Sequence, residues 1–303
     1  MPVTNPYAAQ IAATPVRDAR VSVLGSDTGY WDYGPLDAPT TIVVVHGFRG
    51  EHHGLEPVVA QLEGIRIVSP DLPGFGDSTP MAKGSHDIHG YAAWLAAFVD
   101  SLELAERPVI LGHSFGSIVA AAAVAGGLAT PRLILVNPIA APALAGPKAI
   151  LTALAVFYYR AATWLPEKLG LRLLGSRLVV RFMTETMAKT RDKGLRRWIH
   201  DQHLTYFSRF SDRDTVLDAF RASTSNNVIQ FAPDIHVPTL LIAASDDPIT
   251  SVADEQKLAS LLSDSTLHVI PGVGHLIHYE TPRQAAGYII DFLGVGRLSA
   301  TSR

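Results

Sequence analysis

The chain has 303 residues, of which 48% are hydrophobic and 17% charged, and its net charge is −3. This length suits one large α/β domain, or a core domain with an inserted subdomain. The lack of a basic excess argues against a nucleic-acid partner, and the absence of cysteine excludes disulfides, thiolate catalysis and Cys-based metal sites.

The first twenty or so residues are rich in Pro and Ala, and we expect them to be poorly ordered. They show no basic start followed by an apolar run, as a signal peptide would. The most apolar window, residues 149–159, is too short to cross a bilayer. We therefore expect no membrane span and a cytoplasmic location, and the oligomeric state stays open.

Short apolar runs rich in β-branched residues then alternate with helical patterns. Continuous Val, Ile and Leu runs are typical of strands that are buried on both faces. The alternation predicts an α/β fold with a mostly parallel central sheet flanked by helices, and two earlier segments, 21–24 and 30–33, are expected to enter the sheet antiparallel. The predicted parallel strands are 41–45, 65–69, 109–111, 133–136, 239–243 and 267–270, and the predicted core helices are 91–102, 117–125, 254–262 and 282–292.

The last of these helices has a clear start signal. Thr281 is placed to be the N-cap, Pro282 fits the first helical position, and Gln284 would complete a capping box.

The alternation stops between residues 138 and 232, where only helical patterns occur. We predict helices at 148–165, 169–190, 196–207 and 214–223. The expected organisation is an α/β core built from residues 1–137 and 233–303, with a helical cap inserted at 138–232. A cap is favoured because ligands bind at the carboxyl ends of such strands, where the insert leaves the core. Peripheral helices with no role at the site are the alternative.

The strongest local motif is Gly112-His113-Ser114-Phe115-Gly116, which lies between a predicted strand and an Ala-rich helix. A sharp turn in this setting exposes the serine hydroxyl at the top of a sheet and leaves no room for side chains at the two glycines. The helix that follows directs its positive end at a developing oxyanion. Ser114 is therefore the candidate nucleophile, whereas a plain Gly/Ser turn is the alternative.

A serine nucleophile needs a base and an acid that orients the base. His275 follows the last predicted strand, with His278 as its nearest rival among twelve histidines. Asp247 lies in a loop after the strand 239–243 and is favoured over Asp246, although both acids could simply shape the turn. The chain order Ser, Asp, His agrees with a hydrolase arrangement and differs from the orders of two protease classes.

An oxyanion hole needs two backbone donors. The Phe115 amide follows the nucleophile, and the Phe48 amide lies in the loop His46-Gly47-Phe48-Arg49-Gly50 after a strand. The polar stretch at residues 49–53 either lines the mouth of the site, where it would meet an acidic or polar substrate end, or is a solvated loop.

Taken together, these residues resemble the α/β-hydrolase superfamily, in particular its serine esterase and lipase-like members with a helical cap. The resemblance covers residues 21–138 and 238–293, in the motifs HGFRG (46–50), DLPGFGDS (71–78), GHSFGS (112–117), SDDPIT (245–250) and GVGHLIHYETP (272–282). It implies the same site: Ser114 as nucleophile, Asp247 as acid, His275 as base, and Phe48 and Phe115 as oxyanion donors. It also implies that 71–78 is a structural turn and that no cofactor or metal is needed.

The resulting hypothesis is hydrolysis of a small or medium apolar carboxylic ester, or a similar acyl substrate, through an acyl-enzyme. Two alternatives remain: a carbon–carbon bond hydrolase or lyase of the same fold, and a receptor that binds a small ligand without turnover. The first is weakened because such hydrolases typically have a Ser-Gly-Pro-Gly-rich loop and a Trp after the histidine, where this chain has Phe48-Arg49 and Leu276. Aromatic residues of the cap either line an apolar pocket or pack the cap's own core; they are Phe157, Tyr158, Tyr159, Trp164, Phe182 and Phe207.

Overall fold

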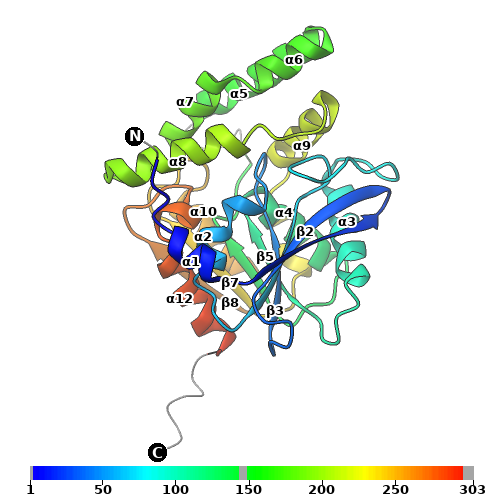
Figure 1. Ribbon diagram of the computed structural model, residues 1–303, viewed down its shortest axis with the longest axis vertical. Helices are drawn as coiled ribbons and strands as arrows, with labels where there is room; N and C mark the ends of the chain where they lie inside the picture. Colours follow the sequence, from blue (N-terminus) through cyan, green and yellow to red (C-terminus); the bar gives the residue numbers. More distant parts are fainter. Residues whose placement is uncertain (1–2, 143–148, 296–303) are drawn as a thin grey trace, which may run out of the picture.

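The computed structural model describes residues 3–142 and 149–295. At its centre lies an eight-stranded sheet in the order β1-β2-β4-β3-β5-β6-β7-β8 (Figure 1). β1 pairs antiparallel with β2, and β2 with β4, whereas all later pairs are parallel. The strands are β1 (Val16–Val23), β2 (Ser26–Tyr33), β3 (Thr41–Val45), β4 (Arg66–Pro70), β5 (Val109–His113), β6 (Leu133–Val136), β7 (Thr239–Ala244) and β8 (Ser265–Ile270). The predicted α/β fold with its antiparallel entry is confirmed.

Helices cover both faces of the sheet. Successive strand residues point to opposite sides, so a continuous apolar strand has apolar side chains on both faces that must be buried. In β3, Val43 and Val45 join one buried cluster, whereas Ile42 and Val44 join the other. Each fully buried aliphatic side chain contributes about 1.5–3 kcal/mol, which explains why these runs are continuously apolar. The first cluster includes side chains of α3 (Ile88–Ser101), α4 (Phe115–Ala125) and α10 (Val252–Leu261); the second includes those of α2 (Glu56–Val59), α11 (Ile277–Glu280) and α12 (Pro282–Leu293).

Within the described residues 3–20 the N-terminal segment has a defined structure, so the expectation of a poorly ordered start is wrong for them. It forms α1 (Ala8–Ala13), and β1 begins at Val16. The anchor is Tyr7, whose ring packs edge-on against Trp198 and whose hydroxyl donates a 2.6 Å hydrogen bond to the carbonyl of Tyr279. An aromatic contact far along the chain thus overrides the local composition.

The capping box expected at Thr281 is absent, although α12 begins at Pro282 as predicted. Thr281 closes the preceding turn of α11 by donating its amide to Ile277, and its side chain makes no capping hydrogen bond. Gln284 instead donates its side-chain amide to the hydroxyl of Tyr288.

Between β6 and β7 the chain forms α5 (Ala149–Trp164), α6 (Glu167–Leu174), α7 (Arg177–Met187), α8 (Lys193–Tyr206) and α9 (Arg213–Ser225). These five helices, here called the helical insert, lie together on one side of the molecule (Figure 1). The helix predicted at 169–190 is two helices, because the chain breaks at Gly175 and continues with an extended Ser176. Residues 143–148 of the predicted cap, and 296–303 of the core, lie outside the described residues.

Three short 3₁₀ turns complete the described chain: His52–Gly54, Val228–Gln230 and Ala232–Asp234. Among residues 3–142 and 149–295, no helix combines the length and the apolar character needed to cross a membrane.

Candidate active site

Ser114 occupies a strained turn between β5 and α4. Its backbone angles, φ 54° and ψ −118°, lie outside the regions that L-residues normally adopt. A hydrogen bond from its amide to the carbonyl of Val136 holds this conformation at the end of the neighbouring strand. The turn therefore places the hydroxyl of Ser114 at the carboxyl edge of the sheet.

The two motif glycines are needed because other backbone atoms come very close to them. A Cβ at Gly112 would lie 2.3 Å from the carbonyl oxygen of Gly116, and one at Gly116 would lie 2.2 Å from that of Val45. Neither position has room for a side chain, so the sequence-based interpretation of this motif agrees with the local packing.

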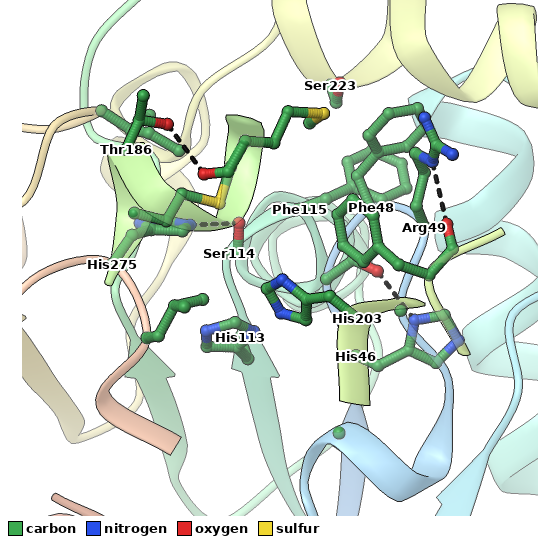
Figure 2. Close-up of a pocket in the computed structure, with 18 of the residues that line it drawn as sticks. His46, Phe48, Arg49, His113, Ser114, Phe115, Thr186, His203, Ser223 and His275 are labelled. Carbon is green, nitrogen blue, oxygen red and sulfur yellow. Dashed lines mark hydrogen bonds between the residues drawn. The ribbon is translucent and has the colours of Figure 1, made fainter. Parts of the chain in front are cut away.

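His275 lies in the loop after β8 and contacts the predicted nucleophile directly. Its Nε2 is 2.7 Å from Oγ of Ser114 (Figure 2). Its Nδ1 is 2.7 Å from Oδ2 of Asp247. His278, the rival base, is buried instead against the ring of His113, at a centroid distance of 4.2 Å. The histidine that contacts Ser114 is thus the one that the sequence favours.

Asp247 accepts hydrogen bonds on both carboxylate oxygens. Oδ2 accepts from His275 and from Nδ2 of Asn137, and Oδ1 accepts from the amides of Ile249 and Thr250. Burial by itself raises the pKa of this carboxyl, but the attraction of His275 and these hydrogen bonds outweigh burial and lower it. The carboxylate is therefore ionised and fixed in place.

The neighbouring Asp246 has a different environment, because it is exposed and accepts a hydrogen bond from the hydroxyl of Ser245. Its amide donates to the carbonyl of Val273, which ties the loop after β7 to the loop that carries His275. Sequence reasoning missed Asn137, a buried residue with φ 45° that follows β6. Its position at the carboxyl end of a central strand was the available signal.

The loop after β3 lies beside the nucleophile. A Cβ at Gly47 would be 3.2 Å from Cβ of Ser114, and Phe48 and Phe115 border the same cavity as Ser114. Phe115 is the first residue of α4, so its amide has no carbonyl partner within the helix. The two predicted oxyanion donors thus belong to segments that meet at Ser114.

Two further histidines beside His275 are neutral. Burial, followed by repulsion from His275, lowers the pKa of His113 to about 3, and burial also lowers the pKa of His278 well below its usual value. Because neither ring takes up the second proton that would make it a cation near neutral pH, they add no positive charge beside His275. Another buried histidine, His46, accepts a hydrogen bond from the amide of Leu72 through Nε2 and so ties the loop after β3 to the segment after β4.

A cavity of about 460 Å³ lies between the core and the helical insert, with Ser114 and His275 on its wall. Its lining is mostly apolar. Four of the six aromatic residues singled out in the predicted cap line it, whereas Phe157 and Trp164 do not and are exposed. The four are Tyr158, Tyr159, Phe182 and Phe207.

The polar stretch at residues 49–53 is mostly buried, so its interpretation as a solvated loop is wrong. Arg49 is 1% exposed, and its guanidinium points toward the insert (Figure 2). It donates hydrogen bonds to the carbonyls of Phe207 and Leu174, and to the hydroxyls of Tyr159 and Ser208. The residue after Phe48 thus connects the oxyanion loop to three parts of the insert.

The segment also brings together Glu51, His52 and His53, whose ligand-type atoms lie within 4.8 Å of one another. Each residue already has a protein partner. Nδ1 of His52 contacts Asp71, Nδ1 of His53 contacts Glu51, and Glu51 forms an ion pair with Arg209. The guanidinium on the only carboxylate of the group disfavours a cation there, and the arrangement acts as a bridge between core and insert. Asp71 serves this bridge from the turn that follows β4, as its predicted structural role requires.

Comparison with known proteins agrees with this architecture. A profile of the Alpha/beta hydrolase family matches residues 42–287. The chain is 28% identical to a non-heme chloroperoxidase of Burkholderia pyrrocinia, over 81% of this chain and 88% of that protein. It is 24% identical to a 2-hydroxy-6-oxononadienedioate/2-hydroxy-6-oxononatrienedioate hydrolase of Cupriavidus pinatubonensis, over 84% and 86%.

Among solved structures, a thermophilic esterase from Thermogutta terrifontis superposes with a TM-score of 0.73 and 21% identity, covering 92% of this chain and 98% of that one. A likeness at this identity concerns the fold, while the family profile spans most of the chain, from β3 into α12. This chain belongs to the alpha/beta hydrolase family.

Proposed function

We propose that the protein hydrolyses a carboxylic ester through a covalent acyl-enzyme on Ser114. The observation that supports this most is the unbroken series of contacts from Ser114 through His275 to Asp247, with both distances at 2.7 Å. An imidazole held between a hydroxyl and a carboxylate is able to take the hydroxyl proton as the oxygen attacks.

In the first half of the reaction, His275 takes the proton of Ser114 through Nε2 while Oγ adds to the ester carbonyl. The amides of Phe48 and Phe115 then donate to the oxyanion, and Asp247 stabilises the imidazolium that forms. Collapse of the tetrahedral intermediate breaks the bond to the alcohol, and the alkoxide leaves with the proton from His275.

In the second half, His275 takes a proton from water, which attacks the acyl-enzyme at the same carbonyl. The second tetrahedral intermediate collapses, the acid leaves, and Ser114 regains its proton from His275. The chain supplies every residue that these steps need. The alcohol is the leaving group, and water is the only co-reactant.

The cavity supports an apolar acyl or alkyl group. A volume of about 460 Å³ falls in the range of pockets that enclose small organic ligands. We assign the role of a cap to the insert within the boundaries 138–232, between the core parts 1–137 and 233–303. Residues of α5, α7, α8 and α9 line the same cavity as Ser114, which supports this assignment.

Cleavage of a carbon–carbon bond is the second candidate, because one of the relatives above is named as a hydrolase of that kind. Ester hydrolysis is preferred, since the loop after β3 and Leu276 depart from the pattern of those hydrolases. A ligand receptor is the third reading, and turnover distinguishes it from both enzymes.

The test is a panel of p-nitrophenyl esters from acetate to decanoate, assayed beside a vinylogous diketone from aromatic ring cleavage. We expect multiple turnovers on the esters and an initial burst of p-nitrophenol equal to the enzyme concentration, because these activated esters acylate the serine faster than water hydrolyses the acyl-enzyme. The Ser114→Ala variant should lose the burst and at least about 10³-fold in kcat.

Three outcomes would overturn the proposal. They are turnover of the diketone without turnover of any ester, tight binding of an ester with no release of product, and full activity of Ser114→Ala.

A further inference from the structure

Large apolar side chains are exposed on α5 and α7, which with α6 form the layer of the helical insert that lies beyond α8 as seen from the sheet (Figure 1). Their exposure ranges from 58% for Leu154 to 82% for Leu178. We call this set the apolar face; it consists of Leu154, Phe157, Trp164, Leu178 and Phe182. Scattered exposed apolar residues are ordinary, but a set gathered on two helices marks an interaction surface.

The spacing of these residues follows the helix period. Leu154, Phe157 and Trp164 fall at i, i+3 and i+10 of α5, and Leu178 and Phe182 fall at i and i+4 of α7. The rings of Phe157 and Trp164 pack edge-on at 6.0 Å, so the two form one aromatic unit at the surface. Each helix thus presents an apolar stripe that no described residue covers.

The apolar face is continuous with the mouth of the cavity. Leu154 and Phe182 are more than half exposed, yet both line the cavity that contains Ser114. An apolar molecule that reaches the surface at these two residues can therefore move into the cavity along apolar side chains.

The charge around the apolar face is strongly positive. Residues 149–197 contain ten Lys or Arg and three Asp or Glu, whereas the other residues contain 15 and 25. A chain of net charge −3 thus concentrates a charge of +7 in one segment of the insert, which includes both helices of the apolar face.

Two of these cations adjoin residues of the apolar face along α7. Arg177 and Arg181 are exposed and precede Leu178 and Phe182 on α7. Within the described part of the chain, neither guanidinium has a carboxylate within 4.0 Å. Apolar side chains with exposed arginines beside them and a tryptophan among them are the composition of segments that lie in the interface of anionic membranes.

We propose that the apolar face docks on an anionic phospholipid surface and admits ester substrates that are dissolved in it. The docking stands on the face itself, while the substrate class, a lipid-soluble ester, rests on the proposed function. Positive charge next to the apolar stripe favours an anionic lipid surface over an apolar protein partner, since the acidic remainder of the chain would orient the insert toward the lipid.

The test uses the full chain and vesicles of phosphatidylcholine, with or without 30% phosphatidylglycerol. Trp164 is the reporter, because it is 70% exposed, whereas Trp94 and Trp198 are buried and Trp31 is half-buried in the core, stacked on His52. We expect co-sedimentation with the anionic vesicles, a blue shift of tryptophan emission that Trp164→Phe removes, and release by 0.5 M NaCl.

Two sets of variants locate the surface. The triple variant Phe157→Ser, Trp164→Ser and Leu178→Ser should stay in the supernatant, whereas the matched control Leu36→Ser, at a residue 56% exposed on the core, should bind like the wild type.

Neutralising Arg177 and Arg181 to Gln should weaken binding about tenfold or more. Neutralising Arg107 and Lys257, two exposed cations of the core, should leave binding unchanged.

Binding must also survive in Ser114→Ala, so failure of the catalytic proposal would not mask the docking. The proposal is overturned if the wild type binds neither kind of vesicle, or if the triple variant binds as the wild type does. It is also overturned if the wild type binds no vesicles and light scattering shows that it is a dimer, whereas the triple variant is a monomer.

Discussion

Replacing Asp247 by Asn tests how the carboxylate controls His275. All four partners of Asp247 are donors: His275, Asn137, and the amides of Ile249 and Thr250. An Asn side chain has one acceptor oxygen and one NH₂ group. Two of the four donors would therefore face the new NH₂ group, which is itself a donor, unless their own donor groups rearrange.

The two sides of the carboxylate differ in their ability to change. The amides of Ile249 and Thr250 are always donors, but His275 can move its proton from Nδ1 to Nε2 and so accept. Asn137 can turn its side chain, because its Oδ1 has no partner among the described residues. The new NH₂ group should therefore face His275 and hold the imidazole with its proton on Nε2, the nitrogen that contacts Ser114.

With Nε2 protonated, the imidazole is unable to take the proton of Ser114. We expect kcat for a p-nitrophenyl ester to fall about 10⁴-fold, which equals about 5.5 kcal/mol in the activation free energy. The variant should remain folded by circular dichroism, since no heavy atom is added and the new NH₂ group finds acceptors in Nδ1 of His275 and Oδ1 of Asn137.

The matched control is Asp246→Asn, which removes the neighbouring charge in an exposed position. It should change kcat less than twofold. A loss below tenfold in Asp247→Asn, or an equal loss in both variants, would refute the tautomer argument.

Three other predictions concern packing, burial of charge and the insert. Gly116→Ala should lower the free energy of unfolding by about 3 kcal/mol, because the new Cβ would lie 2.2 Å from a carbonyl oxygen of β3. Gly287→Ala in α12 should raise the free energy of unfolding by up to about 1 kcal/mol, because a Cβ there meets nothing within 4 Å. Equal urea midpoints for the two would contradict this. Burial raises the pKa of Glu255 well above its usual value, so ionisation of this group favours the unfolded chain. Glu255→Gln should therefore stabilise the protein at pH 8, and the gain should shrink to zero near pH 4.5, by about 1.4 kcal/mol for each pH unit below the pKa of the folded state. The control Glu63→Gln, at an exposed residue, should show no such trend. Arg49→Met should lower the free energy of unfolding by about 3 kcal/mol and speed chymotrypsin cleavage of the insert, because the four hydrogen bonds that Arg49 donates to the insert are lost. An unchanged cleavage rate would argue against Arg49 as a link between the core and the insert.

Much of the fold and the candidate site was predictable, because the relevant signals are local. A buried parallel strand requires a continuous apolar run, and the sharp turn at Ser114 requires Gly112 and Gly116 on either side. Parallel strands bring their carboxyl ends to one edge of the sheet, so loops that follow β5, β7 and β8 meet there. That rule alone places Ser114, Asp247 and His275 near one another.

Contacts between distant segments were not predictable. The sequence around Arg49 is polar, and local reasoning assigns such residues to solvent. The carbonyls that bind its guanidinium come from residues more than a hundred positions later, at Phe207 and Leu174. The order of the N-terminus depends likewise on a contact between Tyr7 and Trp198. The break at Gly175 was missed because the apolar pattern continues through it.

The role of Asn137 belongs to the same class. An Asn before a Pro indicates a turn, and only the register of β6 beside β7 brings its side chain to Asp247. The expected cytoplasmic location stays a prediction, and it is compatible with an insert that docks on the inner face of a membrane.

The central claim is that the imidazole at position 275 activates one particular hydroxyl. The most direct measurement is the site and rate of modification by a fluorophosphonate, mapped by tandem mass spectrometry in the wild type and in His275→Gln. The account predicts a single adduct on Ser114 that forms at least about 10³-fold more slowly in the variant. An adduct on a different serine, or equal rates in the two proteins, would contradict it.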